Sequence, residues 1–423
     1  MFKGIRAVTY RQKLFVQLIL IFSFLLSSNG LMPRYLLEIF SIDNSFVKGL
    51  YTLLIVLTVI VWLVDSNFFR KSNRIFSDGK KLWLPLLYLF YIVGVFLSTH
   101  TDLALRSLER HMAILLVPLM IYSEKRILMI NSELIFKWFR TGVLISQLMM
   151  LTLALINSSG LFIHEMMYNN LAVFNHPSYL AIASTLSLIL AYRELYEARY
   201  SKWTIIEVIM NIAFILLFNS KSGILCLLLL LIAITLRKLT NGWSGLKKSI
   251  AGIVSILLLV ALIFGVSKYN RRFGYALRSL TFESLDYPKV LGSTETRRAV
   301  WSLTPEIIDG KWLFGQGTGD IDKHRLEIYK KFGFKAGYES KINSHNQFIE
   351  IFVTLGLFAL ILFIGAIIIA WVKCKGNFYS LLILSLFLIN FLFESMLERQ
   401  SGILMFTCFY GMIFILSKPL KLK

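Results

Sequence analysis

The sequence predicts an all-α polytopic membrane protein with about 12 transmembrane helices and one large, partly helical loop between the ninth and tenth helices. Hydrophobic residues make up 57% and aromatic residues 14% of the 423-residue chain, and the mean hydropathy is +0.68. A soluble domain keeps a mostly polar surface, so this composition excludes that class. Long apolar segments recur along the chain, and basic residues gather on alternate connections between them.

A helix that crosses the hydrocarbon core needs about 20 mostly apolar residues. The first such segment follows several basic residues and leads into a further one, which indicates a retained helix and not a cleaved signal peptide. The fourth is short and is interrupted by Pro118. The approximate cores of the expected spans are 14–30, 47–64, 82–98, 111–123, 140–157, 177–192, 204–219, 222–236, 249–267, 347–372, 379–396 and 401–417.

The formal net charge of +21 follows from the same topology. With the N-terminus in the cytoplasm, roughly 25 Lys and Arg residues fall on cytoplasmic connections and about six on short external loops. Another group of about 14 lies in the long segment near 268–346, and long segments translocate regardless of charge. Both termini are therefore expected in the cytoplasm and the long segment outside. The basic excess does not indicate a nucleic-acid partner.

The long segment divides the chain into three expected parts. An N-terminal transmembrane bundle of about nine spans covers 1–267, a loop domain covers 268–346, and a C-terminal bundle of about three spans covers 347–423. The three cysteines lie in expected spans or in a cytoplasmic turn, so neither a disulfide framework nor a metal-spaced cysteine cluster is expected. They are Cys226, Cys374 and Cys408.

The loop domain contains two amphipathic, helix-like stretches, 293–308 and 320–334. The first has a Ser/Thr start signal and then apolar residues at helical spacing. Between them lies the glycine-rich stretch GKWLFGQGTGD (310–320). Its G-x-G-x-G spacing, with no strand before it, favours a flexible turn over a nucleotide phosphate loop.

His345 lies where the loop domain meets the tenth span, in a run of hydrogen-bonding side chains from Asn343 to Gln347. The free N–H groups and the dipole of a helix start favour anions. A neutral imidazole there can accept a proton from a sugar hydroxyl or bind a phosphate; alternatively, these residues only cap the helix. Asn346 and Glu350 share one helix face, and Glu350 is either a functional carboxylate or a partner for an Arg or Lys.

Two cations are candidates for binding an anion. Arg297 lies on an expected external helix with Val300 and Trp301 on one face, and its guanidinium can bind a phosphate bidentately. Lys221 lies in a short polar turn between two apolar spans, where a cation needs an anionic partner. The alternatives are an arginine that faces solvent or headgroups, and a lysine that extends to the headgroups.

A second external loop, 157–181, carries three residues with ligand chemistry, His164, Glu165 and His176. His176 precedes Pro177, which suits the first turn of the next span. The separation of the two histidines matches no helical pairing, so we expect no metal site.

The connection 393–402 joins the last two spans and carries Glu394, Glu398 and Arg399. Charges of opposite sign this close in sequence are expected to neutralise one another. The sequence alone therefore assigns no chemistry to this turn.

Taken in order, these motifs resemble the O-antigen ligase and O-antigen polymerase superfamily of bacterial envelopes. The resemblance covers mainly residues 170–400, and the earlier part agrees only in span number and topology. It rests on SHNQFIEIFVTLG (344–356), RRAVW (297–301) ahead of GQGTG (315–319), NSKSG (219–223) and FNHPSYLA (174–181).

The resemblance implies an inverting, metal-independent glycosyl transfer at the periplasmic face of the bacterial inner membrane, with no cofactor. The donor is then a glycan on undecaprenyl diphosphate, and the acceptor is a sugar hydroxyl of lipid A-core or of a second lipid-linked glycan. The resemblance assigns the acceptor-assisting histidine to His345 and donor-diphosphate binding to Arg297 and Lys221. Asn346, Glu350 and His176 are expected to support the site. The family commonly has Arg where this chain has Lys221, which keeps the charge but loses the planar fork.

Other functions remain open at this point. A ligase is favoured over a polymerase by the single large loop late in the chain, although both share the same motifs. A polysaccharide transporter usually shows internal repeats and broken helices, and this sequence has no repeat. A purely structural role in an assembly is a further alternative.

Overall fold

The computed structural model describes residues 10–28, 44–64, 79–157, 171, 176–240, 244–247, 249–250, 252–255, 257, 285–290 and 292–416. All regular elements within these residues are helices, as predicted. The helices are α1 (Tyr10–Ser28), α3 (Asn44–Leu63), η1 (Gly79–Leu82), α5 (Trp83–Leu97), α6 (Thr101–Ser123), α7 (Lys125–Asn157), α8 (Pro177–Tyr196), α9 (Lys202–Leu217), α10 (Lys221–Leu239), η2 (Tyr287–Lys289), α13 (Ser293–Ser302), α14 (Thr304–Ile308), α15 (Ile321–Lys331), α16 (Lys335–Glu339), α17 (Gln347–Cys374), α18 (Phe378–Phe393), η3 (Met396–Glu398) and α19 (Gln400–Leu416).

The described helices support the predicted membrane class but not the count of about 12 spans. By length and composition, four of them can cross a bilayer: Gly79–Leu97, Lys125–Ile156, Lys221–Leu239 and Gln347–Cys374. Shorter apolar helices cover Leu53–Leu63, Phe378–Phe393 and Gln400–Phe414. The expected ninth span, 249–267, lies largely outside the described residues.

Two helices begin well before the expected spans. α6 starts at Thr101 and continues through Pro118, where only 111–123 was expected. α7 starts at Lys125 instead of near residue 140. Its first half is amphipathic and buries Ile127 and Phe136 among charged residues, so hydropathy alone marks only the second half as a span.

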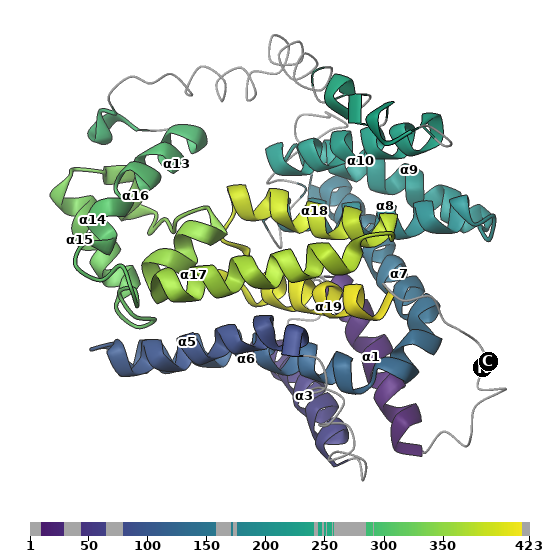
Figure 1. Cartoon of the computed structure of the whole chain (residues 1–423), viewed down its shortest axis with the longest axis horizontal. Helices are drawn as coiled ribbons and strands as arrows, with labels where there is room; N and C mark the ends of the chain where they lie inside the picture. The colour runs from purple at the N-terminus through teal and green to yellow at the C-terminus, as the bar shows by residue number, and fades with distance from the viewer. Residues whose placement is uncertain are drawn as a thin grey trace.

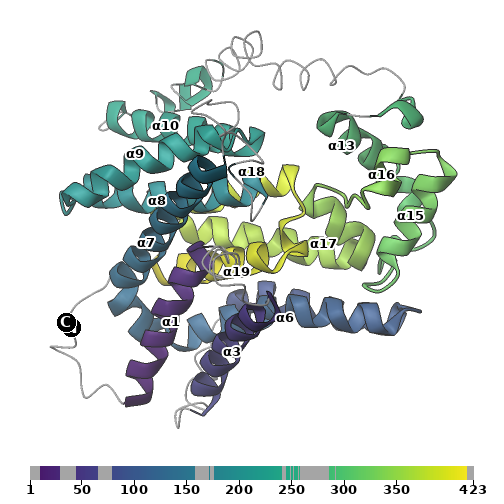
Figure 2. The same cartoon turned by 180° about the vertical axis from the view of Figure 1, so that it is seen from behind.

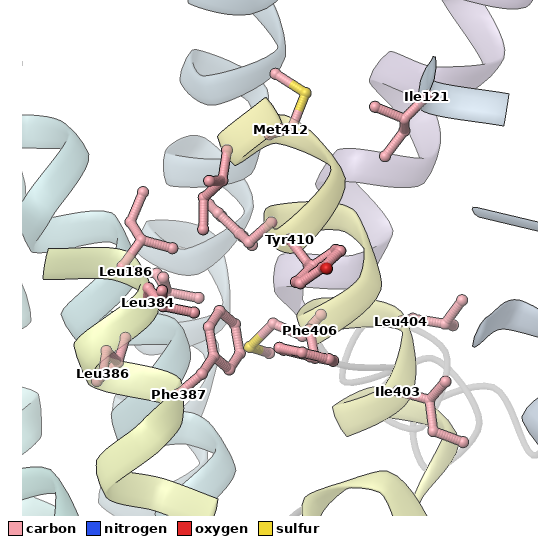
Figure 3. Close-up of a cluster of buried hydrophobic side chains, with 14 of the residues drawn as sticks. Ile121, Leu186, Leu384, Leu386, Phe387, Ile403, Leu404, Phe406, Tyr410 and Met412 are labelled. Carbon is pink, nitrogen blue, oxygen red and sulfur yellow. The ribbon is translucent and has the colours of Figure 1, made fainter. Parts of the chain in front are cut away.

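The helices α17, α18 and α19 lie at the centre of the bundle (Figures 1 and 2). In both views α9 and α10 lie on one side of them, and α1, α3 and α6 lie on the other. Aromatic rings of α18 and α19 pack edge to face. The ring centroids are 5.0 Å apart for Phe391 and Phe406 and 5.4 Å apart for Phe387 and Phe406. Figure 3 shows this core around Phe387, Phe406 and Tyr410. The one polar atom of the Tyr410 side chain donates to the Ala366 carbonyl at 3.0 Å, so this buried ring costs no unpaired hydroxyl.

Helices α13 to α16 form a small helical unit at one end of the bundle (Figure 1). We call this the site end. The unit has its own apolar core, in which Val300 and Tyr329 are fully buried. Val353 of α17 belongs to the same core and ties the unit to the bundle. The predicted amphipathic face of 293–308 therefore packs inward, as its spacing indicated.

The glycine-rich stretch 310–320 is held by backbone hydrogen bonds to α17 and is not the flexible turn that the sequence predicted. α17 is broken at Gly356, whose φ of 86° and ψ of −175° are not helical. The break frees backbone groups, and the glycine-rich stretch binds them: Gln316 N donates to Val353 O at 2.9 Å, and Leu357 N donates to Trp312 O at 2.9 Å. A Cβ at Gly356 would lie 2.2 Å from the Leu313 carbonyl oxygen, so the close approach requires glycine. This contact fixes the site end against α17.

Candidate active site

The carboxylate of Glu394, directly after α18, joins three segments that are far apart in the sequence. Arg297 Nη2 donates to its Oε1 at 3.0 Å, and His345 Nδ1 lies 3.1 Å from its Oε2. Ser178 of α8 donates to Oε1 at 3.4 Å. The structure therefore brings together two predicted site residues, Arg297 and His345, through a third that the sequence did not identify.

Glu394 is ionised at neutral pH. Burial opposes its ionisation, but the hydrogen bond from His345 and the charges of His345, Arg297 and His176 outweigh burial and lower the pKa of Glu394 to about 2. An ionised carboxylate only accepts hydrogen bonds, so Nδ1 of His345 carries the proton in this pair. In its neutral form the imidazole presents its Nε2 lone pair as a base, and Glu394 can stabilise the imidazolium that forms when it accepts a proton.

The backbone around His345 is held in an uncommon conformation. His345 has a φ of 45°, in the left-handed region that a residue with a Cβ rarely adopts. Its N–H donates to Asn343 Oδ1 at 3.1 Å, and the preceding carbonyl, Ser344 O, accepts from Trp301 Nε1 at 2.9 Å. Such conformations cluster at functional sites, where the surroundings over-determine them. Here the left-handed conformation of His345 directs its imidazole toward Glu394.

The two polar residues that follow His345 on α17 have supporting positions. Asn346 is the N-cap of α17, because its Oδ1 accepts from Phe348 N at 2.9 Å, and its Nδ2 donates to Leu392 O at 3.3 Å. The cap of this helix is therefore Asn346, and the side chain of His345 is directed elsewhere. Both bonds hold the start of α17 beside the end of α18.

Glu350 pairs with Arg325 of α15. Of the two roles that the sequence allowed, a functional carboxylate or a partner for a basic residue, the structure shows the second. Arg325 Nη2 donates to Glu350 Oε1 at 2.5 Å, and both side chains are 3% exposed. The other carboxylate oxygen accepts from Ser344 N at 2.8 Å. Glu350 thus anchors the residue before His345 and has no contact with Glu394 among the described interactions. Its position indicates support of the backbone.

Lys221 and Arg297 meet at the first turn of α13. Lys221 is the first residue of α10, with Ser220 as its N-cap, and so does not lie in the short polar turn that the sequence predicted. Its Nζ donates to Ser293 Oγ at 3.2 Å and to Thr294 Oγ1 at 2.9 Å. Arg297 Nη1 donates to the carbonyl of the same Ser293 at 3.1 Å. Two cations and the positive end of a ten-residue helix therefore converge, an arrangement that attracts a multivalent anion.

A chain of serine hydroxyls links Glu394 to the start of α10. Ser178 Oγ lies 3.2 Å from Ser220 Oγ, which lies 3.2 Å from Ser222 Oγ. Gly223 permits the close approach of α10 to α8, because a Cβ there would lie 2.5 Å from Cβ of Ala181. The NSKSG motif thus connects Lys221 to the same carboxylate that orients His345.

His176 is the N-cap of α8 beside this chain. Its Nδ1 accepts from Ser178 N at 3.4 Å. Burial lowers the pKa of His176; Glu394 acts against this, and the positive charges of Arg399, His345 and Arg297 act with it. His176 therefore borders the site, beside the serine chain that leads to Glu394.

Glu394 is the residue that sequence reasoning missed. Its neighbours in sequence, Glu398 and Arg399, suggested mutual neutralisation, but Glu398 instead lies 3.8 Å from His111 and 3.9 Å from Arg110. The available signal was a carboxylate directly after an apolar helix, with three residues between it and the next acidic residue. Within the described residues no three His, Cys, Asp or Glu side chains could hold a metal ion, and His164 and Glu165 lie outside that part.

The fold and the site together define a helical membrane protein with a His–Glu–Arg cluster at one end of its bundle. Residues 206–364 match the model of a protein family described as O-antigen ligase. The match places this segment in the O-antigen ligase superfamily and confirms the resemblance predicted from the motifs. It includes Lys221, Arg297 and His345, whereas His176 and Glu394 lie outside it. No curated protein matches the chain.

Proposed function

We propose that this protein transfers a glycan from undecaprenyl diphosphate to a sugar hydroxyl of lipid A-core, at the periplasmic face of the bacterial inner membrane. The convergence of His345, Arg297 and Ser178 on Glu394 carries this proposal. It supplies a positioned base, and Arg297 connects that base to a cationic place for a diphosphate at the first turn of α13. The O-antigen ligase family match supports a ligase or polymerase type of reaction.

In the proposed reaction, His345 Nε2 accepts the proton of the acceptor hydroxyl while that oxygen attacks the anomeric carbon of the donor. The bond from this carbon to the diphosphate oxygen breaks, and the electron pair leaves with undecaprenyl diphosphate. Attack from the opposite face inverts the configuration. The imidazolium is stabilised by Glu394 and later loses its proton to water.

Lys221 and Arg297 stabilise the negative charge that develops on the leaving diphosphate. Arg297 is 18% exposed and is oriented by bonds to Phe393 O, Ser293 O and Glu394. Fixed cations of this kind lower the barrier because they need no reorganisation during the reaction. The proposal assigns this work to the chain itself, so it includes neither a metal ion nor a cofactor.

Reconstitution tests the proposal. Purified protein in vesicles, given undecaprenyl-diphosphate-linked glycan and lipid A-core, should form glycosylated lipid A-core without ATP or an ion gradient. Gradient-dependent movement of the glycan with no new glycosidic bond would instead support a transporter.

The second candidate is a polymerase, which uses the same donor chemistry with a lipid-linked glycan as acceptor. Deletion of the gene separates the two. Loss of a ligase leaves full-length chains on the carrier lipid, whereas loss of a polymerase leaves single repeats on lipid A-core.

A further inference from the structure

An apolar groove of about 320 Å³ lies between α1, α3, α6, α7 and α19. Its size falls in the range of roughly 300–1,000 Å³ that is typical of ligand pockets. Figures 1 and 2 show three of its helices, α1, α3 and α6, on the side of α17–α19 opposite to α9 and α10. The groove is therefore separate from the Lys221–Arg297 cluster, which involves α10 and α13.

The walls of the groove suit a hydrocarbon chain. Most of its lining side chains are aliphatic or aromatic. Two hydroxyls occur along the apolar part, and each is already satisfied: Ser23 donates to Ile135 O at 3.1 Å and Thr58 donates to Leu54 O at 2.7 Å. A polar ligand would find no partner there and would pay the cost of desolvation.

The polar lining residues gather at one end of the groove. They are Glu109, Arg110 and Gln400; Gln400 is the first residue of α19, and the other two lie in the N-terminal half of α6. Arg110 is 44% exposed, and its Nη1 donates to Glu398 O at 3.3 Å. Glu398 lies in the same turn as Glu394, so this end of the groove adjoins the candidate active site. The Arg110 guanidinium also lies 3.9 Å from the Glu398 carboxylate and is the cation at this end. A cation above an apolar groove matches a lipid with a phosphate-bearing headgroup.

The groove also has a lateral opening. Val56 of α3 and Met112 of α6 both line it, and they are 45% and 42% exposed. These exposed lining residues mark the side, between α3 and α6, at which a chain from the surrounding bilayer can enter.

We propose that this groove holds a hydrocarbon chain of the acceptor lipid, with Arg110 beside the headgroup phosphate. This inference rests on the proposed function, in which both substrates are lipids. The donor diphosphate binds at Lys221 and Arg297, on the far side of α17–α19, so its chain descends on that side. The turn that carries Glu394 and Glu398 then separates the two lipids, and the acceptor sugar reaches His345 over it.

Leu116→Trp tests the groove, because Leu116 lines it and is half-buried. Leu105→Trp is the matched control, since Leu105 lies on the same helix, is 54% exposed and does not line the groove. The assay compares lipid A-core with the same core oligosaccharide released from its lipid. We expect Leu116→Trp to raise the apparent KM for lipid A-core about tenfold, equivalent to about 1.4 kcal/mol of binding. The KM for the released oligosaccharide should stay unchanged, and Leu105→Trp should change neither value.

An equal effect of Leu116→Trp on both acceptors, or no effect on either, would overturn the inference. Photolabelling of the unaltered protein tests it without any variant: lipid A-core with a diazirine in an acyl chain should label α3, α6 and α19. Labelling of α10 and α18 instead would also overturn it. The proposed function fails by a different result, the absence of transfer to both acceptors.

Discussion

Two buried ionic clusters in this protein differ in what surrounds them. Arg140 of α7 is 4% exposed and binds Glu194 at 2.6 Å and Glu207 at 2.7 Å. Around Glu394, by contrast, Arg297 is 18% and His345 28% exposed. The first cluster is closed and joins three helices, α7, α8 and α9. The second has the same kind of pairing but leaves an imidazole accessible.

The difference shows why burial of charge alone does not identify an active site. A buried ion pair resists the loss of either partner, because an uncompensated charge would remain. An accessible base held by a buried carboxylate can instead meet a substrate. Substitutions of Arg140 and of His345 should therefore have opposite signatures: loss of folded protein for Arg140 and loss of reaction for His345.

The largest expected effect is that of His345→Ala compared with Arg140→Ala. His345→Ala should lower kcat by about 10²–10⁴-fold, the usual contribution of a general base, at unchanged protein abundance. Arg140→Ala should cost about 3–5 kcal/mol of stability and reduce the amount of folded protein in the membrane. Transfer assays normalised to folded protein, together with thermal unfolding in detergent, measure both. Full activity of His345→Ala would contradict the role of the imidazole.

The second prediction concerns the cations. Arg297→Ala should lower kcat by about 10²–10³-fold, because it removes a fixed charge from the leaving diphosphate. Arg297→Lys should recover only part of this loss, since an ammonium lacks the planar fork. Lys221→Arg should be tolerated and Lys221→Ala should not. Single-turnover rates with the lipid-linked donor provide the measurement. Activity of Lys221→Ala equal to that of the unaltered protein would exclude this residue from the diphosphate site.

The sequence predicted the helical membrane class and the amphipathic helix that carries Arg297, because both depend on local spacing. The order of its motifs predicted the family resemblance. It could not predict Glu394 as the meeting point. Arg297, His345 and Glu394 lie on three segments, and only the tertiary packing of α13 and α17 against the end of α18 brings them together. The break at Gly356 was missed for the same reason, because the glycine-rich stretch that stabilises it lies about 40 residues earlier.

The third prediction uses the pKa of Glu394. Its folded-state value of about 2 lies below the ordinary value of 4.5, so the carboxylate contributes stability above pH 4.5 that is lost as the pH falls toward 2. Glu394→Gln should therefore flatten the loss of thermal stability between pH 4.5 and 2. It should also lower kcat by about 10–100-fold, because the amide cannot stabilise the imidazolium. An unchanged pH dependence of unfolding would contradict the ionised state of Glu394.

The smallest expected effect on kcat is that of replacing a helix N-cap, and it should differ between two similar caps, Asn346 and Asn377. Asn346 caps α17 next to His345, and Asn377 caps α18 through Ser380 N at 3.1 Å, at the other end of that helix. Replacing either residue with Ala should cost about 1 kcal/mol of stability. Only Asn346→Ala should also lower kcat, because it releases the start of α17 from Leu392 O and lets His345 turn away from Glu394. Thermal unfolding and transfer rates of the two variants measure this difference. Equal activity at equal stability would mean that Asn346 supports the helix alone, and that the polar run before α17 contributes only His345 to the reaction.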